Sequence, residues 1–196
     1  ERVEPAAVES VELGMEALAA ATDANDARAK LAGFAVEYGA WIEDQRAALP
    51  AHERRRDVGE ELLKRARFAQ TRIEAGIAAL ADPLVFEAFQ IANRAMAAAA
   101  RQREAQQRGV APDAVSPPRW RPFQLAFLLM NLRGIAEPAA GEREIVDLLF
   151  FPTGGGKTEA YLGLAAFTLV LRRLRNPGLA SAGMSVLMRY TLRLLT

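Results

Sequence analysis

A short run of residues, 151–158, has the composition of a phosphate-binding loop: Phe-Pro-Thr-Gly-Gly-Gly-Lys-Thr. Glycines let backbone N–H groups close around an anion, because no Cβ blocks the approach. The residues predicted to surround a triphosphate are Thr153, Gly154, Gly155 and Gly156. Lys157 is predicted to neutralise the β and γ phosphates and Thr158 to coordinate Mg²⁺, which makes these two the candidate catalytic residues. We therefore expect ATP and Mg²⁺ as cofactors.

The start of this run departs from the general pattern of such loops. That pattern places a glycine six residues before the lysine, and Phe151 occupies the position here. The alternative interpretation is a glycine-rich turn between a strand and a helix that binds no ligand.

The segments around the loop predict the elements that position it. Residues 145–151 and 184–188 are near-continuous apolar runs, which are typical of strands in a parallel sheet covered on both faces. A helical pattern over residues 157–175 lies between them, and a further helix is expected at residues 123–132. We therefore predict the beginning of a parallel α/β nucleotide-binding lobe over residues 123–196.

Residues 5–108 predict a separate helical domain. Apolar residues recur there at three- and four-residue steps, and alanine, the best helix former, is frequent. Short connectors favour an antiparallel bundle. The expected helices cover residues 5–21, 27–49, 53–81 and 84–108. The prolines that interrupt the pattern afterwards are Pro112, Pro117, Pro118 and Pro122. Residues 109–122 are therefore predicted to be a linker.

The end of this linker, Arg121-Pro122-Phe123-Gln124, resembles the Q motif of superfamily 2 helicases. A glutamine amide offers one donor group and one acceptor, as adenine's amino group and neighbouring ring nitrogen require. Arg121 and Gln124 are therefore predicted to bind the nucleotide. In the alternative interpretation, Gln124 lies on the polar side of the predicted helix. Trp120 could stack on the base or anchor the linker.

The last basic residues of the chain favour contact with a nucleic-acid backbone. Residues 186–196 occupy the place of motif Ia, the strand and turn that touches nucleic acid in superfamily 2 helicases. The candidate DNA-binding residues are Arg189, Thr191 and Arg193. Arginines recur from residue 172 to residue 193 with no acidic residue among them, as phosphate binding favours. A solvated basic face is the alternative.

Four stretches together resemble the helicase subunits of the bacterial DISARM anti-phage defence systems, which belong to superfamily 2. These stretches are residues 86–96, 121–127, 151–163 and 188–196. The resemblance implies the N-terminal portion of an ATP-dependent DNA helicase or translocase, with a helical region followed by a RecA-like first ATPase lobe. It also implies two partners: DNA, single-stranded or with an overhang, and a second DISARM subunit, DrmB.

Composition excludes several other classes of protein. With no cysteine and one histidine, disulfides and Cys/His metal sites are excluded. The longest apolar stretch, residues 160–171, is shorter than the roughly 20 residues that span a membrane. We therefore expect a cytoplasmic protein without membrane contact.

Hydrolysis of ATP in this class needs an Asp-Glu motif on a later strand, and no such motif follows the loop. We therefore expect a fragment of a longer chain that does not hydrolyse ATP alone. The alternative function is a P-loop ATPase switch, or a scaffold, that acts on a protein partner rather than on nucleic acid.

Overall fold

The described part of the chain is built from helices. The computed structural model describes residues 8–150 and 155–189. The α-helices are α1 (Met15–Ala19), α2 (Ala24–Leu31), α3 (Gly33–Ala47), α4 (Glu53–Ala79), α5 (Pro83–Arg108), α6 (Pro122–Ala136) and α7 (Lys157–Arg175). Short 3-10 helices lie between or after them: η1 (Pro112–Ala114), η2 (Gly141–Glu144) and η3 (Gly178–Ser181).

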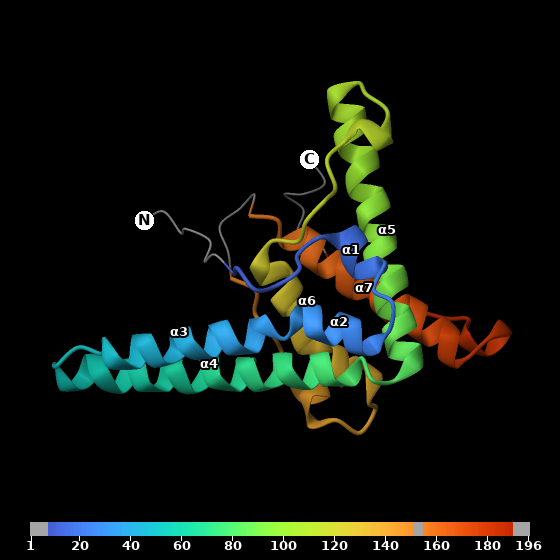
Figure 1. Cartoon of the computed structure of the whole chain (residues 1–196). Coiled ribbons are helices and arrows are strands. Elements are labelled where there is room, and N and C mark those ends of the chain that lie inside the picture. Colours follow the sequence, from blue (N-terminus) through green and yellow to red (C-terminus); the bar gives the residue numbers. More distant parts are fainter. Residues whose placement is uncertain (1–7, 151–154, 190–196) are drawn as a thin grey trace.

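Two helical arms project from a common centre (Figure 1). Helices α3 and α4 run side by side as one arm, at the left in this view, and α5 forms the second arm, which points upward. Helices α1, α6 and α7 lie where the arms meet. Because α4 packs on α6 and α5 packs on α7, the helical region contacts both helices that flank the candidate loop.

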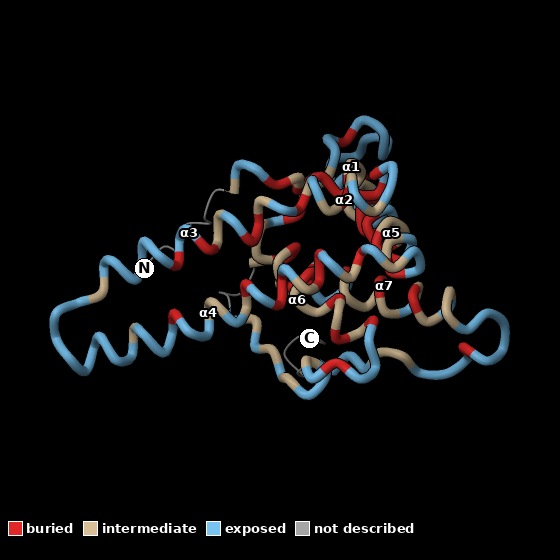
Figure 2. Tube along the Cα trace, turned by 60° about the horizontal axis from the view of Figure 1, so that its bottom comes forward, coloured by how far each residue is buried: buried red, intermediate tan, exposed pale blue. Residues whose placement is uncertain are grey.

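The hydrophobic core lies at this junction. Figure 2 shows the buried residues gathered around α1, α5, α6 and α7, whereas the outer ends of α3 and α4 are exposed. Leu18 of α1, Phe89 of α5, Leu128 of α6 and Phe167 of α7 are each almost completely buried. Each such side chain stabilises the fold by about 1.5–3 kcal/mol. The junction therefore holds the helices that position the loop.

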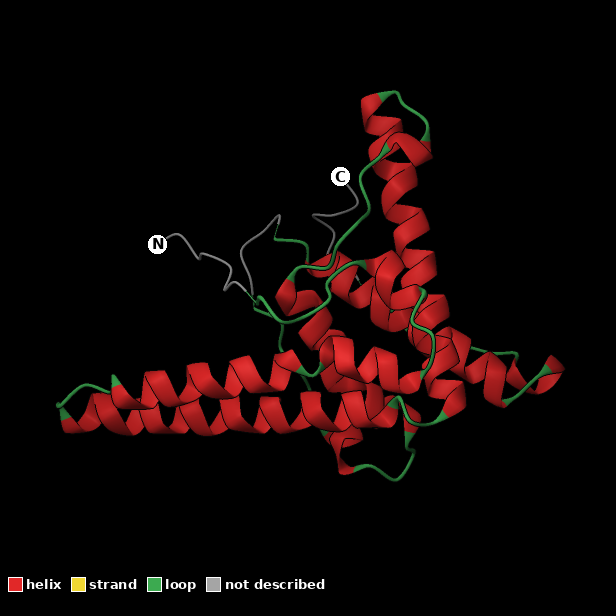
Figure 3. Cartoon of the chain, viewed as in Figure 1, coloured by secondary structure: helices red, strands yellow, loops and turns green. Residues whose placement is uncertain are grey.

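The prediction of a parallel α/β lobe is wrong. Within the described residues the structure has no strand (Figure 3), and an isolated β-bridge joins Gly14 to Arg119. The two strands were expected at residues 145–151 and 184–188. Residue 151 lies outside the described part of the chain, and residues 145–150 and 184–188 have no regular secondary structure. In the described parts of residues 123–196, helices and irregular segments therefore replace the RecA-like lobe that was expected there.

These apolar runs fail as strands for a non-local reason. A strand needs a neighbour that satisfies its backbone N–H and C=O groups, and the identity of that neighbour is set by the fold rather than by the run itself. Val146, Leu148 and Phe150 are 94%, 86% and 87% exposed, so every second side chain faces away from the protein. An apolar run therefore does not imply a buried strand.

The predicted helices at residues 53–81, 84–108 and 157–175 are confirmed. Helices α4, α5 and α7 begin and end within about two residues of the expected bounds. Helix α1 covers residues 15–19 of the predicted helix at residues 5–21, of which residues 5–7 lie outside the described part of the chain. The backbone around its start pairs with the linker. The backbone N–H of Met15 donates to the carbonyl oxygen of Pro118 at 3.0 Å, and that of Trp120 donates to Leu13 at 2.8 Å.

The second predicted helix is divided into α2 and α3. The break falls at Ala32, directly before Gly33. An ideal Cβ at Gly33 would lie 2.8 Å from the carbonyl oxygen of Ser10, so the chain here is shaped by close contact with the N-terminal segment.

Among the described residues, no single helix is both long and apolar enough to cross a membrane. Helices α4 and α5 meet that test only when they are taken together, and they are bent by 103° at the break between them.

Gly76 lets α4 cross closely over α6. An ideal Cβ at this position would lie 1.8 Å from the carbonyl oxygen of Leu129. We expect Gly76→Ala to lower the free energy of unfolding by about 2 kcal/mol, because overpacking of about 3 kcal/mol outweighs a gain of about 1 kcal/mol in helix propensity. Denaturant unfolding measures the change.

The control for this variant is Gly141→Ala, since a Cβ at Gly141 would meet no atom within 4 Å. Its free energy of unfolding should stay within about 0.5 kcal/mol of the wild type. If the two variants were equally stable, α4 and α6 would not cross as closely as the structure shows.

Candidate phosphate-binding site

The candidate loop leads into the N-terminus of α7. Gly156 is the N-cap, and its left-handed backbone (φ 85°, ψ 26°) is strained for other residues. Lys157, partly buried, and Thr158, exposed, follow in the first turn. The first N–H groups of a helix lack intrahelical partners and carry the positive end of the helix dipole, so this end suits an anion. The predicted loop residues outside the described part of the chain are Thr153 and Gly154.

Two residues of the Q-like motif hold this loop by its carbonyl oxygens. The Arg121 guanidinium donates to the carbonyl oxygen of Gly155 at 2.7 Å, and the Gln124 amide donates to that of Gly156 at 2.8 Å. The Gln124 side-chain oxygen accepts from the backbone N–H of Arg121 at 2.8 Å. Gln124 is 4% exposed and therefore does not lie on a solvated face of α6. We call Arg121 and Gln124 the loop brace.

Trp120 anchors the linker in the core. Its indole N–H donates to Oδ1 of Asn93 at 2.8 Å, and the two residues are 2% and 0% exposed. The Asn93 amide in turn donates to the carbonyl oxygen of Phe89 in α5. An ideal Cβ at Gly163 of α7 would lie 2.7 Å from the Trp120 ring. Of the two expected roles, anchoring is the one the structure shows, because the ring is buried against α5 and α7.

The second arm also reaches the first turn of α7. The Arg103 guanidinium of α5 lies 3.2 Å from the Glu159 carboxylate, two residues after Lys157. Sequence reasoning missed this connection between the helical region and the candidate site. No motif marks Arg103, because the contact depends on how α5 packs on α7.

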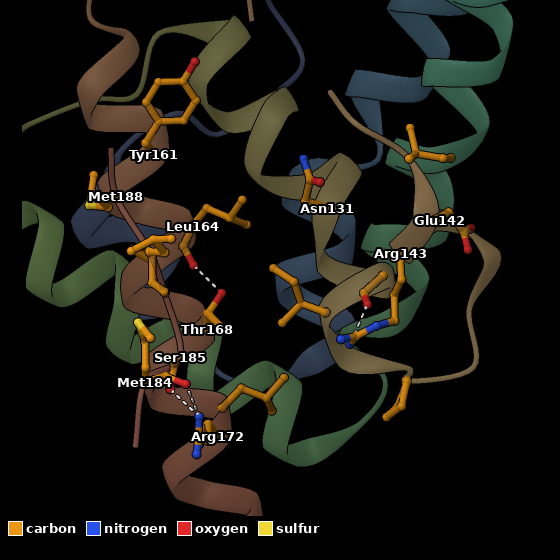
Figure 4. Close-up of a pocket in the computed structure, with 18 of the residues that line it drawn as sticks. Asn131, Glu142, Arg143, Tyr161, Leu164, Thr168, Arg172, Met184, Ser185 and Met188 are labelled. Carbon is orange, nitrogen blue, oxygen red and sulfur yellow. Dashed lines mark hydrogen bonds between the residues drawn. The ribbon is translucent and has the colours of Figure 1, made fainter. Parts of the chain in front are cut away.

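A cavity of about 1010 Å³ extends from the first turn of α7 along the space between α6 and α7 (Figure 4). Lys157 and Thr158 line it together with Arg189, one of the three predicted DNA-binding residues. The structure therefore brings Arg189 to the same cavity as the end of the glycine loop. The other two, Thr191 and Arg193, lie outside the described residues.

Part of the basic run that suggested a nucleic-acid surface is bound within the chain. Arg172 donates to the carbonyl oxygen of Met184 at 2.8 Å, a contact visible in Figure 4. Arg175 forms an ion pair with Asp82 at 3.0 Å, at the start of α5. These two arginines therefore have structural roles, and the basic composition of the run does not by itself define a DNA-binding surface.

A buried ion pair fastens the segment before the loop to the first arm. The Arg72 guanidinium of α4 contacts both carboxylate oxygens of Asp147, at 2.6 and 2.8 Å. Arg72 is 4% exposed, lies over the Phe68 ring at 5.9 Å, and among the described residues its Nε has no hydrogen-bond partner. Sequence reasoning missed this pair, although an acidic residue inside the apolar run 145–150 was a signal.

No model of a known protein family matches the chain. In an alignment 191 positions long that covers 91% of the chain, it is 38% identical to the DISARM protein DrmA of Bacillus paralicheniformis. The chain is DrmA-like. This comparison confirms the resemblance stated from the sequence motifs. The chain spans about 17% of the length of DrmA, so the similarity concerns one segment of that protein.

Proposed function

We propose that the chain binds ATP-Mg²⁺ in an ATP-dependent DNA helicase or translocase that acts in DISARM anti-phage defence. The observation that carries this proposal is the loop brace, which fixes Gly155 and Gly156 at the N-terminus of a 19-residue helix. Similarity to the DISARM protein DrmA supports the defence role. A second DISARM subunit, DrmB, is the proposed protein partner.

The residues at the start of α7 fit a triphosphate. Gly156 has φ +85°, a conformation that is strained for any other residue, and its ideal Cβ would lie 2.7 Å from Nε2 of Gln124. The first-turn N–H groups of α7 attract phosphate oxygens. Lys157 would add positive charge at the β and γ phosphates, and the Thr158 hydroxyl would hold Mg²⁺. When bound, the metal neutralises part of the phosphate charge.

We assign triphosphate binding to these residues, and not the activation of water. Activation in this class requires an acidic Mg²⁺ motif and arginines from a second lobe. Glu159, the carboxylate nearest in sequence to Lys157, is paired with Arg103. Hydrolysis is therefore proposed to need residues supplied by a longer protein.

DNA is the proposed substrate because Arg189 lies beside the same cavity as Lys157 and Thr158. A cation that lines the same cavity can contact a phosphate backbone. Thr191 and Arg193 remain predicted contacts of the same kind.

The test is DNA-stimulated ATP hydrolysis by the full-length protein. We expect Lys157→Ala to bring the stimulated rate to background and to weaken ATP binding at least about tenfold, because one charge at the outer phosphates is lost. Lys64→Ala, which changes an exposed lysine of α4, is the control and should keep both values. Parent activity in Lys157→Ala would exclude the loop from the reaction.

A protein partner is the alternative substrate, and the exposed first arm favours it. Val36, Leu62 and Phe68 are each more than half exposed on α3 and α4. The same assay separates the two functions. Stimulation by DNA should fall steeply as salt rises, since counterion release drives that binding. Stimulation by a protein without DNA would favour a switch.

A further inference from the structure

We propose that Gln124 positions the glycine loop and does not read the nucleotide base. This inference rests on the proposed function and concerns which nucleotides the site binds. The site would take nucleoside triphosphates through their polyphosphate chain, whatever the base. Gln124 is then a positioning residue and not a base-specificity residue.

Both ends of the Gln124 amide are already engaged. Its nitrogen donates to the carbonyl oxygen of Gly156, and its oxygen accepts from the backbone N–H of Arg121, each at 2.8 Å. Reading adenine would require one donor and one acceptor turned toward the base. The amide keeps a second N–H and a second lone pair, but at 4% exposure a base could reach them only if Gln124 moved out of these two contacts. Each broken contact would leave a partly buried backbone group without its partner, which is unfavourable.

The second candidate for base recognition is engaged as well. Trp120 is 2% exposed, its indole N–H is bonded to Asn93, and its ring is buried against Gly163. A ring in this position has no open face for a base to stack on. Neither Gln124 nor Trp120 therefore reaches a base in this arrangement.

The loop brace has a clear effect on the phosphate side. A peptide unit is planar and trans, so its C=O and N–H groups point in opposite directions. The loop brace holds the carbonyls of Gly155 and Gly156 toward α6. The N–H groups of the same two peptide units, which belong to Gly156 and Lys157, are therefore directed to the opposite side. By orienting these two N–H groups, the loop brace affects how the loop binds the polyphosphate chain. All nucleoside triphosphates share that chain.

The experiment is a calorimetric measurement of the affinities of the full-length protein for ATP, GTP and inorganic tripolyphosphate. In the wild type, we expect ATP and GTP to bind within about threefold of each other. In Gln124→Ala, all three affinities should fall by the same factor, roughly tenfold, because the loss acts on the loop. Gln124→Glu, which keeps an acceptor for Arg121 and removes the donor to Gly156, should give the same uniform pattern and serves if the alanine variant does not fold.

The control is Gln90→Ala, which removes an equivalent amide far from the loop. Gln90 donates to the carbonyl oxygens of Ala19 and Ala21 at 3.2 and 2.8 Å, so its loss reports a merely structural effect. It should lower the melting temperature without changing the three affinities.

Three results would overturn the inference. They are a loss confined to ATP in Gln124→Ala, no loss for any ligand, and a wild-type preference for ATP over GTP above about tenfold. Failure of the proposed function looks different: the wild type would then bind none of the three ligands in a way that Lys157→Ala weakens.

Discussion

Replacing Asp147 with alanine is expected to lower the free energy of unfolding by about 4 kcal/mol. The Arg72 guanidinium is 4% exposed, and its charge is balanced by both oxygens of Asp147. Without that carboxylate, a buried cation remains uncompensated. The chain can avoid part of this cost by releasing residues 145–150 from α4. Denaturant unfolding should therefore show the loss of stability, and hydrogen exchange should show faster opening of that segment.

Two further variants test whether the ion pair between Arg72 and Asp147 is buried or behaves as an ordinary surface contact. In Arg72→Met/Asp147→Leu both charges are gone, and the free energy of unfolding should return to within about 1.5 kcal/mol of the wild type. Glu61→Ala breaks the ion pair between Glu61, 51% exposed, and Arg65, 74% exposed. It should lower the free energy of unfolding by less than about 1 kcal/mol. Equal effects of Asp147→Ala and Glu61→Ala would show that the Arg72 pair is not buried in solution.

Replacing Trp120 with alanine is expected to lower the free energy of unfolding by about 4 kcal/mol. The ring is 2% exposed and lies against α7 at Gly163, so its removal leaves a cavity in the core. It also leaves Oδ1 of Asn93, which is 0% exposed, without its donor. Both changes loosen the contact between the linker, α5 and α7. Denaturant unfolding followed by circular dichroism measures the loss.

The chain offers a matched control for this variant in its other tryptophan. Trp41 is 46% exposed and stacks on Tyr38 with ring centroids 5.6 Å apart. Trp41→Ala should therefore cost only about 1 kcal/mol. If removal of Trp120 cost no more than removal of Trp41, the linker would not be anchored by its indole.

Local sequence signals predicted the parts of the fold that local interactions determine. The apolar periodicity predicted helices at residues 53–81, 84–108 and 157–175, and the structure has helices at residues 53–79, 83–108 and 157–175. The Q-like motif and the glycine run were expected to lie near each other, and Gln124 does contact Gly156. Helical periodicity repeats within a few residues and glycines limit the backbone directly, so both signals are visible without knowledge of the tertiary structure.

The features that were missed depend on residues far apart in the sequence. The two apolar runs were read as strands, but strand formation depends on a partner that the run itself does not specify. Arg72 and Asp147 are separated by 75 positions, and Arg103 and Glu159 by 56. No spacing rule connects residues at such distances, because helix packing decides which of them meet. The direct contacts between the arms and the loop were therefore visible only in the structure.

The exposed side chains of Val146, Leu148 and Phe150 have a consequence for how the chain behaves in concentrated solution. They alternate along residues 145–150, which form no ladder within the described part of the chain, and exposed alternating apolar side chains promote pairing between separate molecules. Raising the concentration of the 196-residue chain then favours self-association while each molecule stays folded.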